Sequence, residues 1–276
     1  MILIVGANSN LAKSIASVTS EEVLTFSRNE YQDWHDDSAS GKIRDFFCKE
    51  ENRISKVFVT AGITDPTIDA RKIKEVNLDL PLQIARVASD LGIRTITFGT
   101  VAETFSGLPN QYVASKVALS NEMSRNGYFD TLAHHFRLHT LFGGSTIKKH
   151  MFLGQIIESI LDNKEFCMSA GNQIREYHHV DDVAKIINDI DLNGSIGNFH
   201  ISHGKPHRLV DVALSVFSKY GDLSKLRVGK LEIDQAENFE SRFIPWPSSA
   251  EYSVRSSLEE IGKYVESQIE KGRKVV

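Results

Sequence analysis

The chain has 276 residues, of which 41% are hydrophobic and 25% are charged, and its formal net charge is −4 at pH 7. This length fits one large α/β domain, or one domain with a smaller lobe. The negative balance and the scattered lysines and arginines argue against a nucleic-acid surface, and no apolar run approaches the about 20 residues that cross a bilayer.

Two cysteines, Cys48 and Cys167, lie far apart and have neither a metal-type spacing nor a partner motif. We expect them to be ordinary thiols. The N-terminus leads directly into an apolar segment without a basic region, so no signal peptide is expected. These features predict a protein of the reducing cytoplasm.

The first expected element is a strand over residues 2–5, which stops at Gly6. Short β-branched runs of this kind are typical of strands buried on both faces of a parallel sheet. Small residues then recur at a spacing of three, namely Gly6, Ser9 and Ala12, before a helical stretch begins. A strand, a glycine-headed loop and a helix together present backbone N–H groups to a pyrophosphate. We expect a dinucleotide loop here, and an ordinary turn between strand and helix is the alternative.

The second expected strand ends in Ser27 and Arg28. In dinucleotide-binding units, the residue at this position faces the adenosine ribose, where an acidic side chain favours NAD. An arginine instead offers a fork of donors that suits a 2′-phosphate. The sequence therefore favours NADP(H) over NAD(H), with a solvated loop charge as the other interpretation of Arg28.

Two further strands are expected over residues 56–59 and 94–98, and they lead to Ala61-Gly62 and to Thr100. The apolar residues between these strands recur at intervals of three and four, which predicts one long helix over residues 73–91. Gly92 is suited to end that helix.

Tyr112 and Lys116 lie four residues apart on another expected helix, so both side chains share one face. An ammonium near a phenol stabilises the phenolate, which would lower the tyrosine pKa from its usual value of about 10. A tyrosine tuned in this way exchanges a proton with an alcohol or a ketone. Thr100 could add a hydroxyl to the pair, whereas an exposed pair on a solvated helix face is the alternative.

With Thr100, Tyr112 and Lys116 in place, the chain resembles the short-chain dehydrogenase/reductase superfamily. Its second half resembles the extended branch, the NAD-dependent epimerase/dehydratase family of nucleotide-sugar enzymes. Residues 136–143 are similar to the Arg-x-x-Asn-x-x-Gly segment of that branch. Residues 171–184 are similar to its Gly-x-Gln-x-Arg-Asp-aromatic-x-His-Val-Asp-Asp-Val-Ala motif. The resemblance covers about residues 1–245.

The alternating pattern and the resemblance together imply an α/β fold, a doubly wound parallel Rossmann sheet with a smaller C-terminal substrate-binding lobe. The dinucleotide-binding domain is expected over residues 1–143, with residues 179–204 returning to it. The lobe is expected to comprise residues 144–178 and 205–276.

No metal site is expected. Asp181 and Asp182 are explained by the start of a helix. The histidine pairs 134–135 and 178–179 are expected to be structural or surface residues, because neighbours in a strand point to opposite faces.

The resemblance implies that Tyr112 is the general acid, that Lys116 holds the nicotinamide ribose, and that Thr100 bonds to the carbonyl. It implies cofactor contacts from Gly6, Ser9, Asn10, Leu11, Arg28, Ala61, Gly62, Tyr112, Lys116 and Leu138. The implied substrate contacts are Thr100, Thr140, which stands where the family usually has asparagine, and Arg175, which would face the diphosphate of a nucleotide sugar.

Three reactions share this fold: 4-epimerisation, 4,6-dehydration and ketone reduction. The dehydratases carry Asp-Glu directly after the active-site threonine, whereas Thr100 is followed by Val101-Ala102, with Glu103 one step further on. The expected activity is NADPH-dependent reduction of a nucleotide-linked 4-keto-6-deoxysugar. The alternatives are a 4-epimerase with tightly bound NAD and a non-catalytic NADP(H)-binding protein. The base, the sugar and the product stereochemistry stay open, and a homodimer is one expected assembly.

Overall fold

The computed structural model describes residues 1–49, 53–104, 110–125, 132–190, 197–232, 244–245 and 252–275. Within these ranges, no helix is both long enough and apolar enough to cross a membrane. The chain divides into two compact units. The sheet unit contains the described residues of 1–104, 108–138 and 184–201, and the second unit contains those of 139–183 and 202–276.

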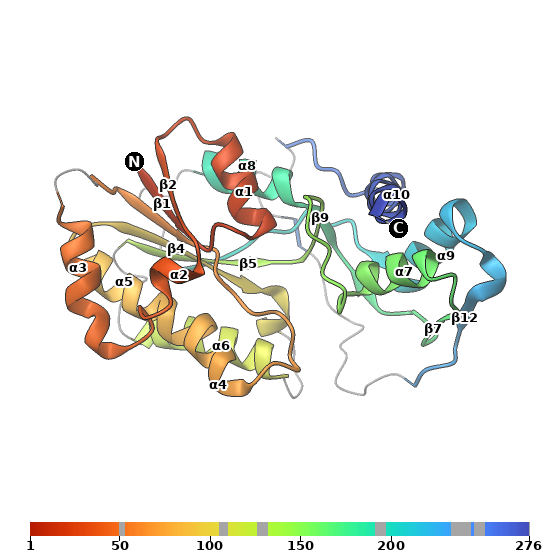
Figure 1. Ribbon diagram of the computed structural model, residues 1–276, viewed down its shortest axis with the longest axis horizontal. Helices are drawn as coiled ribbons and strands as arrows, with labels where there is room; N and C mark the ends of the chain where they lie inside the picture. The colour runs from red at the N-terminus through yellow and green to blue at the C-terminus, as the bar shows by residue number, and fades with distance from the viewer. Residues whose placement is uncertain are drawn as a thin grey trace. The chain divides into compact units, whose positions relative to one another are not determined.

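The sheet unit is built on a six-stranded sheet in the order β10-β5-β4-β3-β1-β2, and every pair of neighbouring strands is parallel (Figure 1). The strands are β1 (Ile2–Val5), β2 (Val23–Phe26), β3 (Lys56–Val59), β4 (Arg94–Thr100), β5 (Ala133–Leu138) and β10 (Gly197–His200). The expected doubly wound parallel sheet is thereby confirmed. Because β2 and β3 lie on opposite sides of β1, the order of the sheet reverses between β1 and β3. Ligands of such sheets bind beyond the carboxyl ends of the strands at this reversal.

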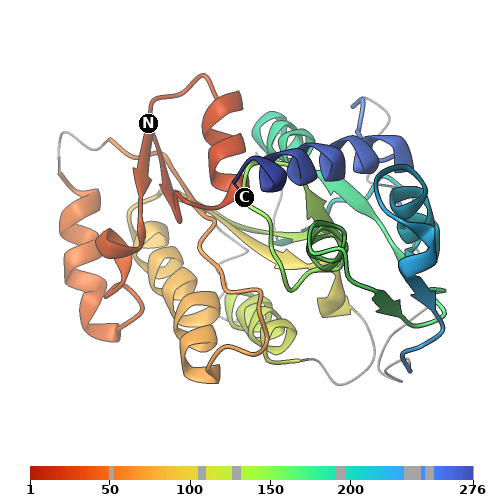
Figure 2. The ribbon, with the colours of Figure 1, turned by 45° about the vertical axis from the view of Figure 1, so that its right-hand side comes forward.

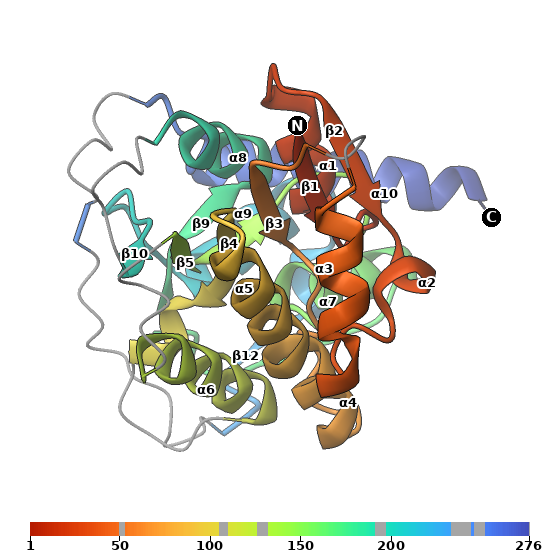
Figure 3. The same ribbon diagram turned by 90° about the vertical axis from the view of Figure 1, so that its left-hand side faces the viewer.

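Helices cover both faces of this sheet. They are α1 (Asn10–Val18), α2 (Arg28–Tyr31), α3 (Ser40–Phe47), α4 (Ala70–Lys74), α5 (Leu80–Asp90), α6 (Gln111–Arg125) and the C-terminal part of α8 (Val180–Asp189). Figure 3 shows α3, α5 and α6 on one face and α1 and α8 on the other. Alternate residues of β1 and β3, such as Leu3 and Val57, pack with Ile43 of α3 and Ile84 of α5 in one apolar cluster. The period-two alternation of the strands therefore sorts their side chains between the two helical layers.

The helix expected over residues 73–91 is interrupted. Between α4 and α5, the chain forms a π-helical segment, η2 (Glu75–Asp79). Pro81 lacks the N–H that would bond to the carbonyl of Asn77, and its ring disfavours a regular turn there. The wider π turn accommodates this position. The expected end of the helix is confirmed, since Gly92 follows α5 with a φ of +70°.

The second unit combines small sheets with three long helices, α7 (Phe152–Leu161), α9 (Leu209–Tyr220) and α10 (Leu258–Val275). The helix α10 packs on both α7 and α9 (Figure 1). The small sheets pair β6 (Thr140–Phe142) with β9 (Tyr177–His179), β8 (Ile174–Arg175) with β11 (His207–Arg208), and β7 (Phe166–Met168) with β12 (Leu226–Val228). Side chains from α7, α9 and α10, such as Ile156, Phe217 and Ile261, form its apolar core. That this unit binds substrate stays a prediction.

Candidate active site

The loop after β1 lies close against the start of the loop after β3. Gly6 has a φ of +109°, and a Cβ at this position would lie 2.4 Å from the backbone nitrogen of Ala61. Only glycine tolerates both the left-handed backbone and this approach. Val5 accepts N–H bonds from Thr60 and Ala61, each of 2.9 Å. Gly6 and Ala61 therefore meet at the reversal of the sheet, where the sequence predicted cofactor contacts.

The loop leads into α1, and Figure 2 shows β1 and α1 in red, joined by this short connection. Ser9 is the N-cap of α1, and its hydroxyl accepts a 3.0 Å bond from the N–H of Ala12. Asn10 and Leu11 are the first residues of the helix. The N-terminus of a helix presents N–H groups and the positive end of its dipole, so this turn is suited to a phosphate.

Arg28 is exposed at the start of α2, directly after the carboxyl end of β2. The nearest acidic residue along the chain, Glu30, bonds to the backbone N–H of Ser27 at 2.6 Å and to its hydroxyl at 2.9 Å. This capping box occupies one oxygen of the acidic side chain, while Arg28 is exposed. A cation thus lies on the chain where the ribose end of a dinucleotide is expected.

The three expected catalytic residues lie at the carboxyl end of the same sheet. Thr100 ends β4 and is paired in register with Leu138, which ends β5. The hydroxyl of Thr100 bonds to that of Tyr112 in the first turn of α6. Lys116 is buried one turn later, and its Nζ lies 3.9 Å from the position that a Cβ on Gly62 would take. The structure therefore brings these residues together.

The expected lowering of the tyrosine pKa is wrong for this structure. Burial and the negative charge of Glu103 raise the pKa of Tyr112 to about 12, although the bond from Thr100 acts in the opposite direction. Burial and a neighbouring anion both disfavour a phenolate. Tyr112 is therefore a neutral phenol at physiological pH.

Glu103 is a candidate functional residue whose place beside Tyr112 sequence reasoning missed. Its side chain is 1% exposed, and its carboxylate accepts bonds from the N–H of Thr100 at 2.7 Å and from Nε of Arg137 at 3.0 Å. Nε2 of His135 lies 3.3 Å from both carboxylate oxygens. Burial raises the pKa of Glu103, but the bonds to His135 and Arg137 outweigh it and hold the pKa below its usual range.

A local sequence signal for Glu103 exists. Thr100-x-x-Glu103 has the spacing of a capping box. The carboxylate bonds back to the N–H of Thr100, and the Thr100 hydroxyl accepts a 3.3 Å bond from the N–H of Ala102. This box fixes the end of β4 and the start of η3 (Val101–Thr104).

Asn77 was also missed. It is fully buried in the π-helical segment η2, and its amide exchanges two bonds of 2.8 Å with the backbone of Ile63. The same amide donates a 3.0 Å bond to the hydroxyl of Ser115, next to Lys116. Asn77 therefore links the loop after Gly62 to the helix that carries Tyr112 and Lys116.

Two of the expected substrate contacts, Thr140 and Arg175, belong to the second unit. The N–H of Thr140, at the start of β6, bonds to the carbonyl of Glu176 at 3.1 Å, which places Thr140 beside the residue that follows Arg175. Arg175 is half-buried in β8, and its guanidinium donates a 2.9 Å bond to the carbonyl of Ile174. The structure therefore places Thr140 next to Glu176, the residue that follows Arg175, although β6 and β8 belong to different small sheets.

A family model described as the NAD-dependent epimerase/dehydratase family matches residues 2–189. The chain belongs to this family. Membership makes it an NAD(P)-dependent enzyme of the extended short-chain dehydrogenase/reductase type, with a nicotinamide dinucleotide as its cofactor. A comparison with curated protein sequences found no match.

Solved structures share the fold over almost the whole chain. The UDP-glucose 4-epimerase of Thermus thermophilus, in complex with NAD, has a TM-score of 0.77 at 17% identity and covers 100% of this chain and 99% of its own. Pal from Bacillus thuringiensis has a TM-score of 0.77 at 14% identity, with 98% and 99% covered. The dTDP-4-dehydrorhamnose reductase of Bacillus anthracis, in complex with NADP, has a TM-score of 0.72 at 17% identity, with 96% and 98% covered.

Two other pairs of adjacent titratable residues, the histidines 134–135 and the aspartates 181–182, have structural partners. The histidines 134–135 contact different groups, since the first stacks on Phe199 and the second bonds to Thr97 at 2.8 Å. Asp182 forms a multidentate ion pair with Arg255, including a 3.0 Å bond from Nε. The expectation that neither feature is a metal site stays a prediction.

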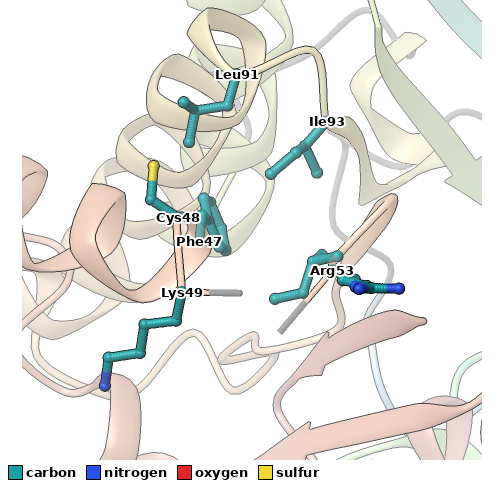
Figure 4. Close-up of a pocket in the computed structure, with 7 residues that line it drawn as sticks. Phe47, Cys48, Lys49, Arg53, Leu91 and Ile93 are labelled. Atoms are coloured by element: carbon teal, nitrogen blue, oxygen red, sulfur yellow. The ribbon is translucent and has the colours of Figure 1, made fainter. Parts of the chain in front are cut away.

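A depression of about 500 Å³ lies elsewhere on the sheet unit (Figure 4). Its lining includes Cys48 at the end of α3 and Ile93 before the start of β4. It therefore lies at the amino ends of the strands, opposite the edge that carries Gly6 and Thr100.

Proposed function

We propose that the protein reduces the keto group of a nucleotide-linked 4-keto-6-deoxysugar with NADPH. The observation that carries this proposal is Tyr112, a neutral phenol bonded to Thr100 with Lys116 one turn away. Reduction of a ketone requires a proton donor at the carbonyl oxygen, and a protonated phenol is that donor.

Each of the three residues has its own task. Thr100 bonds to the sugar carbonyl and positions it, and Tyr112 gives its proton to the oxygen. Lys116 holds the nicotinamide ribose beside them. When bound, NADPH supplies the hydride. A positioned acid of this kind contributes roughly 10²–10⁴-fold to the rate.

The cofactor site is suited to a dinucleotide because the Gly6 backbone approaches Ala61 so closely that no Cβ fits between them. The residues that would hold the cofactor are Gly6, Ser9, Asn10, Leu11, Arg28, Ala61, Gly62, Tyr112, Lys116 and Leu138. Arg28 supports a preference for NADP(H), because its guanidinium would pair with the 2′-phosphate.

Arg175 is proposed to bind the diphosphate of the nucleotide sugar, since a guanidinium matches phosphate oxygens in charge and geometry. Thr140, at the start of β6, would add a hydroxyl to the substrate contacts. The structure of the dTDP-4-dehydrorhamnose reductase is similar in fold, which is consistent with this substrate class. The exposed free thiols of Cys48 and Cys167 are consistent with a cytoplasmic enzyme.

Dehydration is disfavoured because the side chain of Glu103 is buried inside the sheet unit. Its carboxylate is bonded to Thr100, His135 and Arg137 and is 1% exposed, so it has little freedom to exchange protons with a sugar. Epimerisation with tightly held NAD is the second candidate. It is favoured by the similarity to the UDP-glucose 4-epimerase that binds NAD.

The test is a panel of UDP-, dTDP-, CDP- and GDP-linked 4-keto-6-deoxysugars, assayed by the loss of NADPH absorbance. We expect one sugar nucleotide to consume NADPH, and the Tyr112→Phe variant to be the negative control. Interconversion of two sugar nucleotides without added cofactor would support the epimerase instead. NADPH binding without turnover of any panel member would indicate a binding protein.

A further inference from the structure

A buried carboxylate in the second unit is surrounded by imidazoles. We define the Glu176 cluster as Glu176, His139, His178 and His203, whose side chains are between 0% and 3% exposed. They come from the residue before β6, from both sides of Tyr177, and from the segment after β10. This cluster has no part in the mechanism proposed above.

Two of the imidazoles face the same carboxylate oxygen. Oε2 of Glu176 lies 3.2 Å from Nε2 of His139 and 2.9 Å from Nε2 of His178. These three atoms all lie within 4.8 Å of one another. Two imidazole nitrogens and one carboxylate oxygen therefore lie close enough together to reach one ion.

The other carboxylate oxygen is fixed by donors. Oε1 of Glu176 accepts bonds of 3.1 Å from the Ser202 hydroxyl and from the backbone N–H groups of His203 and Lys205. The orientation of the carboxylate is thus set by the donors on the side opposite to the imidazoles.

The backbone around these residues is also fixed. β6 and β9 pair in parallel, with Thr140 opposite Tyr177, so His139 and His178 approach from neighbouring strands. Glu176 and His178 lie two residues apart, which places both side chains on one face of the extended chain. His178 lies in β9, and His139 and Glu176 directly precede β6 and β9, so a pair of strands fixes the backbone at all three residues.

Although the sequence predicted no metal site and a structural or surface role for the histidines 178–179, we propose that His139, Glu176 and His178 form a binding site for a divalent transition-metal ion of the zinc type. Zinc bonds of about 2.0–2.1 Å in a tetrahedron place neighbouring ligand atoms roughly 3.3 Å apart, close to the separations of the Glu176 oxygen from the two nitrogens. Two imidazoles and one carboxylate favour zinc or cobalt over magnesium or calcium. Three protein ligands leave a fourth position for water.

His203 and Ser202 support the ligands rather than join them. Nε2 of His203 lies 3.0 Å from the carbonyl of Tyr177, and its Nδ1 accepts a 3.2 Å bond from the N–H of Lys205. Such outer contacts orient ligands and raise metal affinity. Because the site is buried, the ion would act by tying β6, β9 and the segment after β10 together.

The competing arrangement is a metal-free network in which both imidazoles donate Nε2–H to the carboxylate. The experiment uses the full-length protein, stripped with dipicolinate and titrated with Co²⁺ and with Zn²⁺. We expect one equivalent of Co²⁺ with the visible absorption of a tetrahedral ion, displacement of it by Zn²⁺, and a higher melting temperature with Zn²⁺ but not with Mg²⁺.

Two variants localise the ion. His139→Gln and His178→Gln should each weaken Co²⁺ binding by about 100-fold or more, while His35→Gln, at a partly exposed histidine of the sheet unit, should not. Circular dichroism checks that each variant is folded. Absence of stoichiometric Co²⁺ binding by the unmodified protein would overturn the proposal, and so would unchanged binding in both folded cluster variants.

Discussion

The two units each bury a glutamate among histidines, but the partners of the two carboxylates differ. Glu103 is bonded to one imidazole, His135, and to the guanidinium of Arg137. Glu176 is contacted by three imidazoles, with backbone N–H groups and the Ser202 hydroxyl on its other side. Both side chains are at most 1% exposed.

This difference explains why only one of the two sites is a candidate for metal binding. A guanidinium stays charged at any accessible pH and would repel an ion, so Glu103 is a fixed negative charge with a permanent partner. Imidazoles can lose their protons and offer lone pairs. Glu103 is therefore suited to raising the pKa of Tyr112, and Glu176 to holding an ion.

The largest expected effect is on the turnover rate, which we attribute to residues of the sheet unit. Tyr112→Phe removes only the transferable proton, so turnover should fall by roughly 10²–10⁴-fold while NADPH binding persists. Steady-state kinetics and fluorescence titration with NADPH measure the two quantities. Unchanged turnover in the variant would remove Tyr112 from the mechanism.

The second prediction removes the charge of Glu103. Glu103→Gln leaves Arg137 without its anion, so we expect the free energy of unfolding to fall by about 3 kcal/mol. Because Glu103 raises the pKa of Tyr112, its loss should also shift the high-pH decline of the reduction rate to lower pH. Urea denaturation and a pH–rate profile test both effects.

Glu176→Gln is the matched control, since it also neutralises a buried carboxylate. Glu176→Gln should lower the free energy of unfolding but should not shift the high-pH decline of the reduction rate. The reason is that the raised pKa of Tyr112 is caused by burial and by Glu103. Equal shifts in the two variants would show that the change follows from general destabilisation.

The limits of sequence reasoning follow the same division. Strands ending at Gly6 and Thr100 are recognisable because β-branched runs and the residues after them are local patterns. The neighbours of Tyr112 cannot be recognised in this way. The pKa of Tyr112 depends on the burial of its side chain and on the position of Glu103, and both are set by the tertiary structure. The Glu176 cluster joins residues 139, 176–178 and 203, a combination that no local spacing predicts.

The π-helical segment shows another limit. The periodicity of residues 73–91 predicted one regular helix, but Pro81 and the bonds of buried Asn77 to the chain beyond β3 favour a wider turn. A tertiary contact thus overrides a local pattern in the segment α4-η2-α5, which packs against α6, the helix that carries Tyr112 and Lys116.

The third prediction concerns the cofactor. Arg28→Asp removes the proposed partner of the 2′-phosphate and adds repulsion, so the affinity for NADPH should fall by about 10–100-fold. The affinity for NADH should change much less, and Arg28→Met separates lost attraction from added repulsion. Equal affinities of the unmodified protein for NADPH and NADH would contradict the preference.

The smallest effect concerns acid stability in the second unit. The pKa of Glu176 is lower in the folded chain than the about 4.3 of a free glutamate, so its contribution is present above that pH and is lost as the pH falls towards about 2. We expect a loss of roughly 1–3 kcal/mol across this window. Glu176→Gln should flatten the decline, and an unchanged slope in urea titrations would contradict the assignment.

The most direct test of the proposed reduction follows the hydrogen itself. NADPH deuterated at both C4 positions is incubated with the sugar nucleotide selected from the panel, and the product is examined by NMR and mass spectrometry. A reductase places one deuterium at C4 of the sugar for each NADP⁺ formed. A product without deuterium, formed with no loss of NADPH, would contradict the reductase and indicate that hydride returns from a cofactor retained by the protein.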